Sequence, residues 1–474
     1  MSEGASGKVR KFGEQALAIL PYEPNANQMG VLAAMCDFCI EPVDNSVLLL
    51  HGYAGTGKTS LTGALVKALT ERGIKTILLA PTGRAAKVFA EYSGHPAYTI
   101  HRKIYRQRSY SPDYGGFDLA ENKHTNTFYI VDEASMIPNS STEGATFGSG
   151  RLLDDLTHYV YNGSGCHLIL LGDNAQLPPV GFTDSPALSE ELLSGYGLKV
   201  RNLYLTTIAR QAEESGILHN ATILRNNMQE QCLEKPYLHL QSFDDIEVLS
   251  GEYMSEKISD CYDHDGISET IIITRSNKRA TIFNTGIRNQ ILYREDELVT
   301  GDMLLVAKNN YFWSEEYKEL DFIANGDVAR VDRVRGVEKR YGFRFADVVL
   351  EFPDHGIEVD AKIILDGLLS DTPALSRTDS EKLYSKINAE LTGDKRTRYK
   401  ELKKNPYFNA LQVKYAYTVT CHKAQGGQWK NVFIDLGYIQ EDAFTSLDFY
   451  RWLYTAITRA RKHVYLINYP LDHD

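Results

Sequence analysis

The residues most clearly suited to binding or catalysis form a glycine-rich run, GYAGTGKT, from Gly52 to Thr59. Its glycines allow consecutive backbone N–H groups to curl around phosphate oxygens without a clash from a Cβ atom. Lys58 can reach the β- and γ-phosphates of a nucleotide, and the hydroxyl of Thr59 can hold Mg²⁺. Because a helix that begins here adds partial positive charge, the run predicts the phosphate-binding loop of a nucleoside triphosphatase.

The segments on either side of this run fit that interpretation. An apolar stretch at 47–50 precedes it and is typical of a buried strand. Apolar residues then recur at spacings of three and four, as on one face of a helix: Leu61, Ala64, Leu65, Ala68 and Leu69. Gly73 can end that helix, and 76–80 is the next strand-like stretch. The context therefore predicts a β-α-β unit and argues against a simple glycine turn before a core helix.

Two further motifs follow strand-like stretches. Asp132 can join the Mg²⁺ shell, and Glu133 can orient or deprotonate an attacking water. Gln176 lies in the run GDNAQLPPV, after the stretch at 167–171. Because neighbouring parallel strands line one crevice with their carboxyl ends, we expect Gln176 beside the γ-phosphate. Taken singly, each motif could also be an ordinary polar turn.

The C-terminal region holds two more stretches with possible chemistry. Residues 453–462, LYTAITRARK, form an apolar helical pattern that ends in cations. Arg459 could be an arginine finger, a residue type that accelerates nucleotide hydrolysis by a factor of about 10³–10⁵. It could instead be a cation that is stabilised by the negative C-terminal end of the helix dipole. Arg210 is a second candidate finger. In TVTCHKAQGGQ, at 418–428, glycines after polar residues indicate close approach of the backbone to a ligand.

Composition narrows the class of protein. A chain of 474 residues should hold about three domains. Its net charge of −11 does not favour nucleic-acid binding by bulk electrostatics, although basic residues gather at 102–108 and 395–404. Each basic segment alone is most simply a solvated helix face. No apolar run approaches the roughly 20 residues of a membrane helix, and the start of the chain has no apolar signal core. We therefore expect a cytoplasmic protein without a membrane partner.

Strand-like and helical stretches alternate along most of the chain, which predicts doubly wound α/β layers. Residues 300–365 differ, because short strands separated by turn residues indicate a small antiparallel barrel. Of the six cysteines, Cys36 and Cys39 have C-x-x-C spacing in an apolar helical stretch. Without a second pair or nearby histidines, they are expected to be buried thiols rather than zinc ligands.

In this order, the motifs resemble those of superfamily I helicases, most closely the 5′→3′ group of RecD-like and phage Dda-like enzymes. The resemblance runs from about residue 21 to the C-terminus. The stretches that carry it are Asn27-Gln28, GYAGTGKT, APTGRAA at 80–86, TIH at 99–101, Asp132-Glu133, GDNAQLPP at 172–179, Arg210, HKAQG at 422–426 and TAITRA at 455–460.

The resemblance implies ATP and Mg²⁺ as ligands, with a role for each matching residue. The implied ATP-binding residues are Gln28, Gly55, Thr56, Gly57, Lys58, Thr59, Gln425 and Gly426. The implied metal ligands are Thr59 and Asp132. The implied catalytic residues are Lys58, Glu133, Gln176, Arg210 and Arg459. The implied contacts to single-stranded DNA are Pro81, Thr82, His101, Thr420 and His422.

The fold implied is α/β, with two RecA-like P-loop domains. After an N-terminal extension, 1–20, the first domain covers 21–190 and holds a β-hairpin wedge at 106–126. The second covers 191–300 and 412–474, interrupted at 301–411 by an SH3-like β-barrel with a basic helical extension. Phe117 is a wedge candidate, beside Tyr110 and Tyr114. These rings could split a duplex or simply pack the hairpin onto its own domain.

The function implied is that of an ATP-dependent DNA helicase that moves 5′→3′ on single-stranded DNA and opens the duplex at junctions. A monomer suffices, because the finger arginines lie in the same chain. The alternatives are a DNA-stimulated ATPase or RNA helicase, a P-loop kinase or GTPase, and a nucleic-acid-binding module with a degenerate ATP site. A GTPase would need an Asn-Lys-x-Asp motif, which is absent, and the intact ATP-site residues argue against degeneration.

Overall fold

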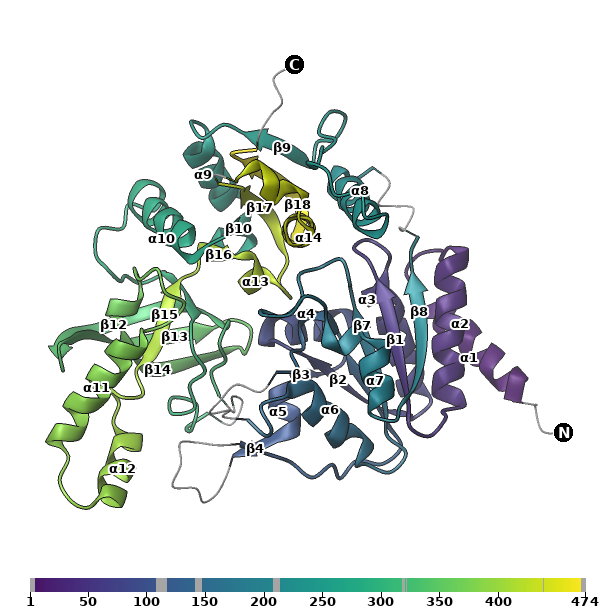
Figure 1. The fold of residues 1–474 in the computed structure, drawn as a ribbon, viewed down its shortest axis with the longest axis horizontal. Helices are drawn as coiled ribbons and strands as arrows, with labels where there is room; N and C mark the ends of the chain where they lie inside the picture. Colours follow the sequence, from purple (N-terminus) through teal and green to yellow (C-terminus); the bar gives the residue numbers. More distant parts are fainter. Residues whose placement is uncertain are drawn as a thin grey trace. The chain divides into compact units, whose positions relative to one another are not determined.

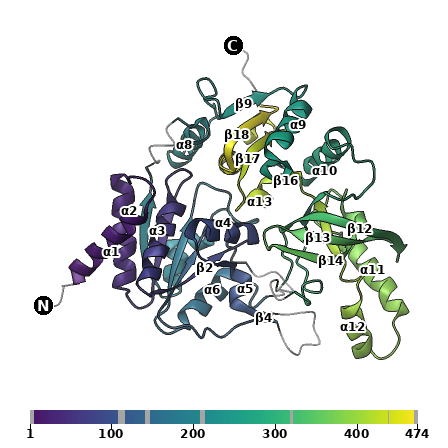
Figure 2. The same ribbon diagram turned by 180° about the vertical axis from the view of Figure 1, so that it is seen from behind.

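The computed structural model describes residues 5–107, 117–140, 147–207, 214–317, 320, 322–437 and 439–469. The chain forms two compact units (Figures 1 and 2). Unit 1 comprises residues 1–245, 425–427 and 440–458, and unit 2 comprises 246–424, 428–439 and 459–474.

Unit 1 is built on a sheet of parallel strands in the order β3-β2-β6-β7-β1-β8. The strands are β1 Ser46–Gly52, β2 Lys75–Ala80, β3 Ala97–Thr99, β6 Thr127–Val131, β7 His167–Gly172 and β8 Lys199–Leu205. Because β8 pairs with β1 along its whole length, this sheet extends past residue 190, where the sequence analysis ended the first domain.

The helices of unit 1 lie before, between and after the strands of that sheet in the sequence. They are α1 Ala5–Ile19, α2 Ala26–Ile40, α3 Lys58–Glu71, α4 Gly83–Ser93, α5 Ile100–Ile104, α6 Leu152–Tyr161, α7 Glu190–Gly195, α8 Gly216–Gln229 and α14 Leu447–Ile457. The apolar strands β1, β6 and β7 are buried along their full length, as expected for parallel strands covered on both faces. The predicted β-α-β unit is confirmed as β1, α3 and β2. Cys36 and Cys39 are both buried in the core between α2 and the sheet, as predicted.

Unit 2 contains a second parallel sheet, in the order β16-β10-β17-β18-β9. Its strands are β9 Ile246–Leu249, β10 Thr270–Thr274, β16 Thr418–Thr420, β17 Trp429–Asp435 and β18 Ala460–Ile467. Its helices are α9 Met254–Asp265, α10 Asn277–Gly286 and the short α13 Cys421–Ala424. The α/β fold class is therefore confirmed in both units.

The predicted barrel is present in unit 2 as a closed set of five strands. They are β11 Met303–Val306, β12 Val328–Arg340, β13 Phe343–Phe352, β14 Ile357–Ile364 and β15 Leu411–Tyr415. Four neighbouring pairs are antiparallel, but β14 and β15 pair in parallel. The chain can return in that direction because α11 Arg377–Glu390 and α12 Lys395–Lys404 supply the long connection that a parallel pair requires.

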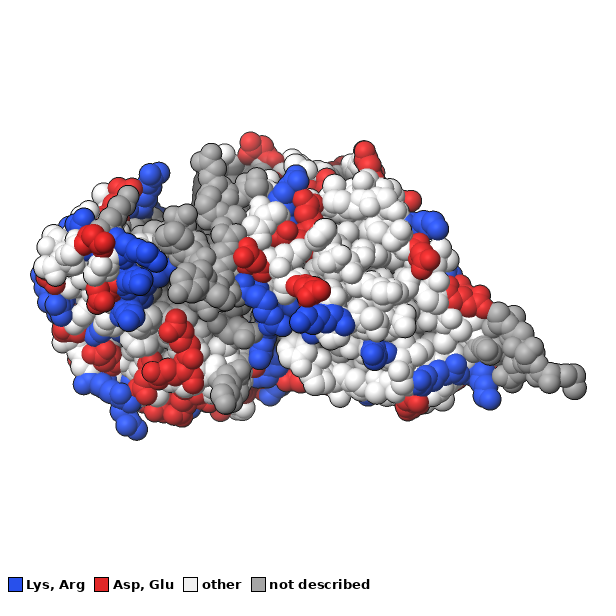
Figure 3. Space-filling model, turned by 90° about the horizontal axis from the view of Figure 1, so that it is seen from below, with Lys and Arg blue, Asp and Glu red and all other residues white. Residues whose placement is uncertain are grey.

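The basic helix α12 lies on the barrel through apolar contacts. Leu402 is buried with Leu383 and Ile387 of α11 against Phe343 and Phe345 of the barrel. Figure 3 shows basic and acidic side chains intermingled over the end of unit 2 that carries these helices, rather than a field of one sign. The other face of α12 is therefore the solvated face that its charge pattern indicates. Among the described helices, none has the length and apolar character needed to cross a bilayer.

Candidate nucleotide site

The glycine-rich loop joins the end of β1 to the start of α3. Gly55 and Gly57 have φ angles of +74° and +83°, a left-handed conformation that favours glycine. A Cβ atom on Gly57 would lie 2.8 Å from both Gln28 Nε2 and Tyr22 Oη, so no larger residue fits without rearrangement. Lys58 starts α3, and its Nζ lies 3.5 Å from the carbonyl oxygen of Gly52. The loop has the strand-turn-helix geometry that presents N–H groups to phosphate.

Gln28 lies under this loop rather than on an open surface. Asn25 caps α2, and the Gln28 side chain closes a reciprocal capping box with it. The Gln28 Nε2 donates a hydrogen bond of 2.9 Å to the carbonyl of Thr56, and only 1% of the residue is exposed. The structure thus brings Gln28 to the predicted nucleotide site, with its amide already bonded to the loop.

Asp132 and Glu133 follow β6 at the same edge of the sheet. Asp132 is buried and accepts a hydrogen bond of 2.8 Å from the backbone N–H of Glu133, which has a φ of +52°. Burial raises the pKa of Asp132 to about 6; the Glu133 carboxylate adds to this rise and the Lys58 charge opposes it. These shifts show that the loop lysine and both carboxylates share one electrostatic environment.

The oxygen donors present suit a magnesium ion. Thr59 and Asp132 supply a hydroxyl and a carboxylate, which are hard ligands of the kind Mg²⁺ prefers. Within the described ranges, no group of three or more His, Cys, Asp or Glu side chains forms a metal site. Mg²⁺ is commonly held by one or two protein ligands plus substrate phosphates, so this donor set fits an ion that arrives with a nucleotide.

The turn after β7 carries Gln176. The Asp173 carboxylate accepts a hydrogen bond of 2.9 Å from the Ala175 N–H, and the Asp173 carbonyl accepts one of 3.3 Å from the Gln176 N–H. Gln176 is 6% exposed, and its buried Oε1 has no hydrogen-bond partner among the described residues. A buried acceptor without a partner is costly, so this atom is available to a water or ligand.

Two segments from late in the sequence enclose this turn within unit 1. Gln425 Nε2 donates to the Leu177 carbonyl at 2.6 Å, and the Leu177 N–H donates to Thr455 Oγ1 at 2.9 Å. Gly426 has a φ of +74°, and a Cβ atom there would lie 3.0 Å from Thr82 Oγ1. Gln425 and Gly426 therefore join the site region by packing on its turns. Sequence reasoning missed Thr455 as a partner of this turn, although it begins one of the motifs that carry the resemblance.

The predicted DNA contacts divide between the two units. In unit 1, Thr82 caps α4 through a hydrogen bond from the Ala85 N–H, directly after Pro81. His101 packs on the Phe147 ring at 4.8 Å, and burial lowers the pKa of its imidazole to about 4, so it is neutral at pH 7. In unit 2, Thr420 ends β16 and the exposed His422 lies on α13.

Of the two candidate finger arginines, only Arg459 lies among the described residues. Arg459 belongs to unit 2, where it is 3% exposed and its carbonyl accepts a hydrogen bond from the Trp429 N–H. Burial raises the pKa of the nearby Cys421 thiol to about 12, and the Arg459 charge acts in the opposite direction. Arg210 lies outside the described residues.

Of the hairpin predicted at 106–126, the structure describes the two strands at its base and not its tip. β4 Tyr105–Gln107 pairs antiparallel with β5 Phe117–Leu119, while Tyr110 and Tyr114 lie outside the described residues. Phe117 is buried and stacks on Phe147 with 4.8 Å between ring centroids. This contact favours a packing role for Phe117, and its wedge role stays a prediction.

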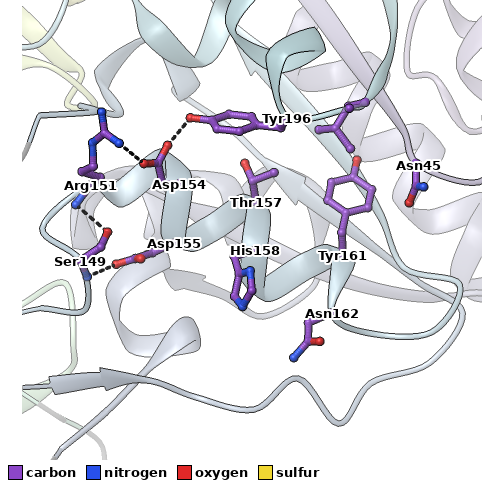
Figure 4. A pocket seen from close by; sticks show the side chains of 12 residues that line it. Asn45, Ser149, Arg151, Asp154, Asp155, Thr157, His158, Tyr161, Asn162 and Tyr196 are labelled. Carbon is purple, nitrogen blue, oxygen red and sulfur yellow. Dashed lines mark hydrogen bonds and ion pairs between the residues drawn. The ribbon is translucent and has the colours of Figure 1, made fainter.

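A separate polar pocket of about 640 Å³ lies along α6 (Figure 4). Its carboxylates and its arginine have partners within the pocket wall. Arg151 pairs with Asp154 at 2.9 Å, Tyr196 donates to Asp154, and the Ser149 N–H donates to Asp155 at 3.0 Å. The side chains of Arg151, Asp154 and Asp155 thus all have partners among the described residues, unlike the Oε1 of Gln176.

Comparisons with known proteins agree with the motif order. A family model described as an AAA domain matches residues 33–239, and one described as a UvrD-like helicase C-terminal domain matches 415–467. The chain is 25% identical over 456 residues to the ATP-dependent DNA helicase Dda of Enterobacteria phage T4, covering 88% of this chain and 93% of that protein. These matches confirm the resemblance predicted from the motifs.

Two longer relatives match only in part of their length. The ATP-dependent RecD2 DNA helicase of Deinococcus radiodurans is 30% identical over 178 residues, which is 37% of this chain and 21% of that protein. An uncharacterized protein of Methanocaldococcus jannaschii, MJ1519, is 25% identical over 465 residues, which is 89% of this chain and 36% of that protein. The chain thus spans about a third or less of these two relatives.

Proposed function

We propose that this chain, a relative of the superfamily I helicases of the RecD-like and phage Dda-like group, is an ATP-dependent DNA helicase. The observation that carries the proposal is the shared edge of the unit 1 sheet. There the glycine-rich loop after β1, the carboxylates after β6 and the Gln176 turn after β7 come from three adjacent parallel strands. Three strand-end loops at one crevice are the expected place for a nucleotide.

Each side chain then has a definite task in ATP hydrolysis. Backbone N–H groups of 55–59 and the Lys58 ammonium hold the phosphates, while Thr59 and Asp132 hold Mg²⁺. When bound, the ion offsets phosphate charge. Glu133 orients and deprotonates the attacking water, and the unpartnered Gln176 Oε1 accepts a hydrogen bond from that water.

The remaining predicted residues complete the proposal. Gln28 stabilises the loop and reads the adenine, Gln425 and Gly426 support the site, and Arg210 and Arg459 supply positive charge to the γ-phosphate. Contacts to single-stranded DNA come from five residues: Pro81, Thr82, His101, Thr420 and His422. Because the imidazole of His101 is neutral, it would contact DNA by stacking or hydrogen bonding rather than as a cation.

We propose that the chain consists of two RecA-like domains. The barrel of unit 2 is an SH3-like insertion, and the hairpin at 106–126 is the wedge that separates the duplex. Movement is 5′→3′ on single-stranded DNA, with junctions between single- and double-stranded DNA as the unwinding substrate. Phe117 contributes to the wedge from the base of the hairpin. A monomer in the cytoplasm is sufficient for this mechanism.

The first test is ATP hydrolysis with and without single-stranded DNA. Strong DNA stimulation is expected, and K58A should abolish it. Lys67 lies on the same helix with an exposed side chain, so K67A is a matched control that should keep normal hydrolysis. Hydrolysis that is indifferent to DNA would contradict the proposal. Single-stranded RNA tests the RNA-helicase alternative in the same assay, and duplexes with 5′ or 3′ tails test direction.

A further inference from the structure

Tyr454 is a buried phenol on α14 that connects two loops of the candidate site. Its hydroxyl donates a hydrogen bond of 2.7 Å to Asp173 Oδ2, at the end of β7. The same oxygen accepts a hydrogen bond of 3.0 Å from the backbone N–H of Ala54, in the glycine-rich loop. The residue is only 1% exposed. A single hydroxyl therefore joins the phosphate loop to the turn that carries Gln176.

Burial and the neighbouring Asp173 carboxylate keep this hydroxyl protonated. Burial raises the pKa of Tyr454 well above its ordinary value, and the Asp173 carboxylate raises it further. Burial also raises the pKa of Asp173, while the Lys58 charge and the hydrogen bond from Tyr454 lower it. The phenol thus remains a donor to Asp173 at neutral pH, with a lone pair left for the Ala54 N–H.

The connection has a direct consequence for Gln176. β1 and β7 are neighbouring parallel strands with His51 opposite Gly172, so the loops that follow them start side by side. Asp173 holds the next turn through the N–H groups of Ala175 and Gln176. Whatever holds Asp173 relative to Ala54 therefore holds Gln176 relative to the phosphate loop.

We propose that Tyr454 is a positioning residue for ATP hydrolysis, which sets the Gln176 turn at its working distance from the phosphate loop. The inference rests on the proposed function and adds a residue to it. Tyr454 touches neither phosphate nor water in this scheme, but acts through Asp173 and Gln176. Thr455, the next residue, supports the same turn by accepting the hydrogen bond from the Leu177 N–H.

The test compares Y454F with Y450F. Tyr450 lies one turn earlier on α14, is fully buried, and donates one hydrogen bond of 2.7 Å to the Glu234 carbonyl. Each variant loses one hydroxyl from the same helix. Y454F leaves Asp173 Oδ2 and the Ala54 N–H unpaired, at a cost that corresponds to a factor of about ten to a hundred. If this cost falls on the positioning of Gln176, kcat should drop by that factor, with the KM for ATP within about twofold. Y450F should change neither constant by more than about twofold.

A double-mutant cycle separates positioning from a general loss of structure. If Tyr454 acts through Gln176, the Y454F substitution should cost less than about twofold in kcat when Q176A is already present. Multiplication of the two single effects would overturn the inference, as would a normal kcat for Y454F. Similar losses in Y454F and Y450F would also overturn it.

Amide hydrogen exchange of the peptide at 51–57, without nucleotide, gives a readout independent of catalysis. Exchange at Ala54 should be faster in Y454F than in the unmodified chain or Y450F. If the unmodified chain hydrolyses ATP with DNA stimulation and Y454F matches it, only the inference fails. If the unmodified chain is inert towards ATP, the proposed function fails and the inference fails with it, whatever the exchange shows.

Discussion

The Nε2 of Gln28 lies 2.9 Å from the carbonyl oxygen of Thr56 and donates a hydrogen bond to it. This contact fastens the first turn of α2 to the glycine-rich loop. Because the Gln28 Oε1 accepts a hydrogen bond of 3.0 Å from the Asn25 N–H, both ends of the amide are engaged. The conformation of the glycine-rich loop therefore depends on the side chain of Gln28, which lies at the start of α2, with the rest of α2 and β1 between it and the loop in the sequence.

Replacement of Gln28 by alanine should weaken ATP binding more than it slows the chemical step. It leaves the Thr56 carbonyl without its donor, at a cost of about 1–3 kcal/mol, and loosens the loop. We expect the KM for ATP to rise about tenfold or more, with kcat within a few-fold, in steady-state assays. M29A, at an exposed position on the same helix, is the control and should behave normally. An unchanged KM for Q28A would contradict this role.

A pair of glycine substitutions separates backbone strain from crowding in the loop. Gly57 and Gly73 both have left-handed φ angles, +83° and +70°, so alanine at either costs about 1–2 kcal/mol. A Cβ atom on Gly73 meets nothing within 4 Å, whereas on Gly57 it would crowd Gln28 and Tyr22. Both variants should melt at lower temperature, but only G57A should lose binding of a fluorescent ATP analogue. Equal loss of binding in both would show that the crowding is unimportant.

Local patterns in the sequence predicted the β-α-β unit, the buried Cys36 and Cys39 and the barrel. The glycine-rich loop is predictable because its conformation depends on a few adjacent residues whose φ angles only glycine adopts easily. The burial of the cysteines follows from helical periodicity, which is also local.

Contacts between distant segments were not predictable in the same way. Tyr454 bonds to Asp173 and Ala54, which lie 281 and 400 residues away in the sequence, and no local period encodes such a pairing. The pairing of β8 with β1 and the parallel pairing of β14 with β15 were missed for the same reason. Phe117 is a further example. Its aromatic side chain made it a wedge candidate in the sequence, but its burial results from stacking on the Phe147 ring, a contact that the sequence did not reveal.

The packing of Phe117 on Phe147 predicts how the hairpin responds to mutation. F117A should destabilise the chain by about 3–5 kcal/mol, because it removes a buried ring that stacks on Phe147. We expect F117A to lower duplex unwinding about tenfold while single-stranded-DNA-stimulated hydrolysis stays within about threefold. F117L keeps most of the buried volume and should keep unwinding. Loss of unwinding in F117L, with hydrolysis intact, would instead make the ring itself the separating element.

The buried ion cluster around Asp302 in unit 2 predicts the acid sensitivity of that unit. Asp302 is fully buried and accepts two hydrogen bonds of 3.0 Å from Arg288, one of 2.7 Å from Arg294 and one of 2.8 Å from Tyr417. Burial alone would raise the pKa of Asp302, but the hydrogen bonds from Arg288 and the Val299 N–H outweigh it and hold the pKa below its ordinary value.

A carboxylate whose pKa is lower in the folded state stabilises that state above its ordinary pKa of about 3.9 and loses this effect as the pH falls through the lower, folded value. At pH 7, D302N should cost about 3–5 kcal/mol, because it leaves buried arginine charge unpaired. The difference in melting temperature between D302N and the unmodified chain should therefore be large at pH 7 and shrink below about pH 4. D360N, which breaks an exposed pair with Arg335, should show little change at either pH. A D302N difference that is the same at pH 3 and pH 7 would show that the Asp302 charge does not hold this cluster together.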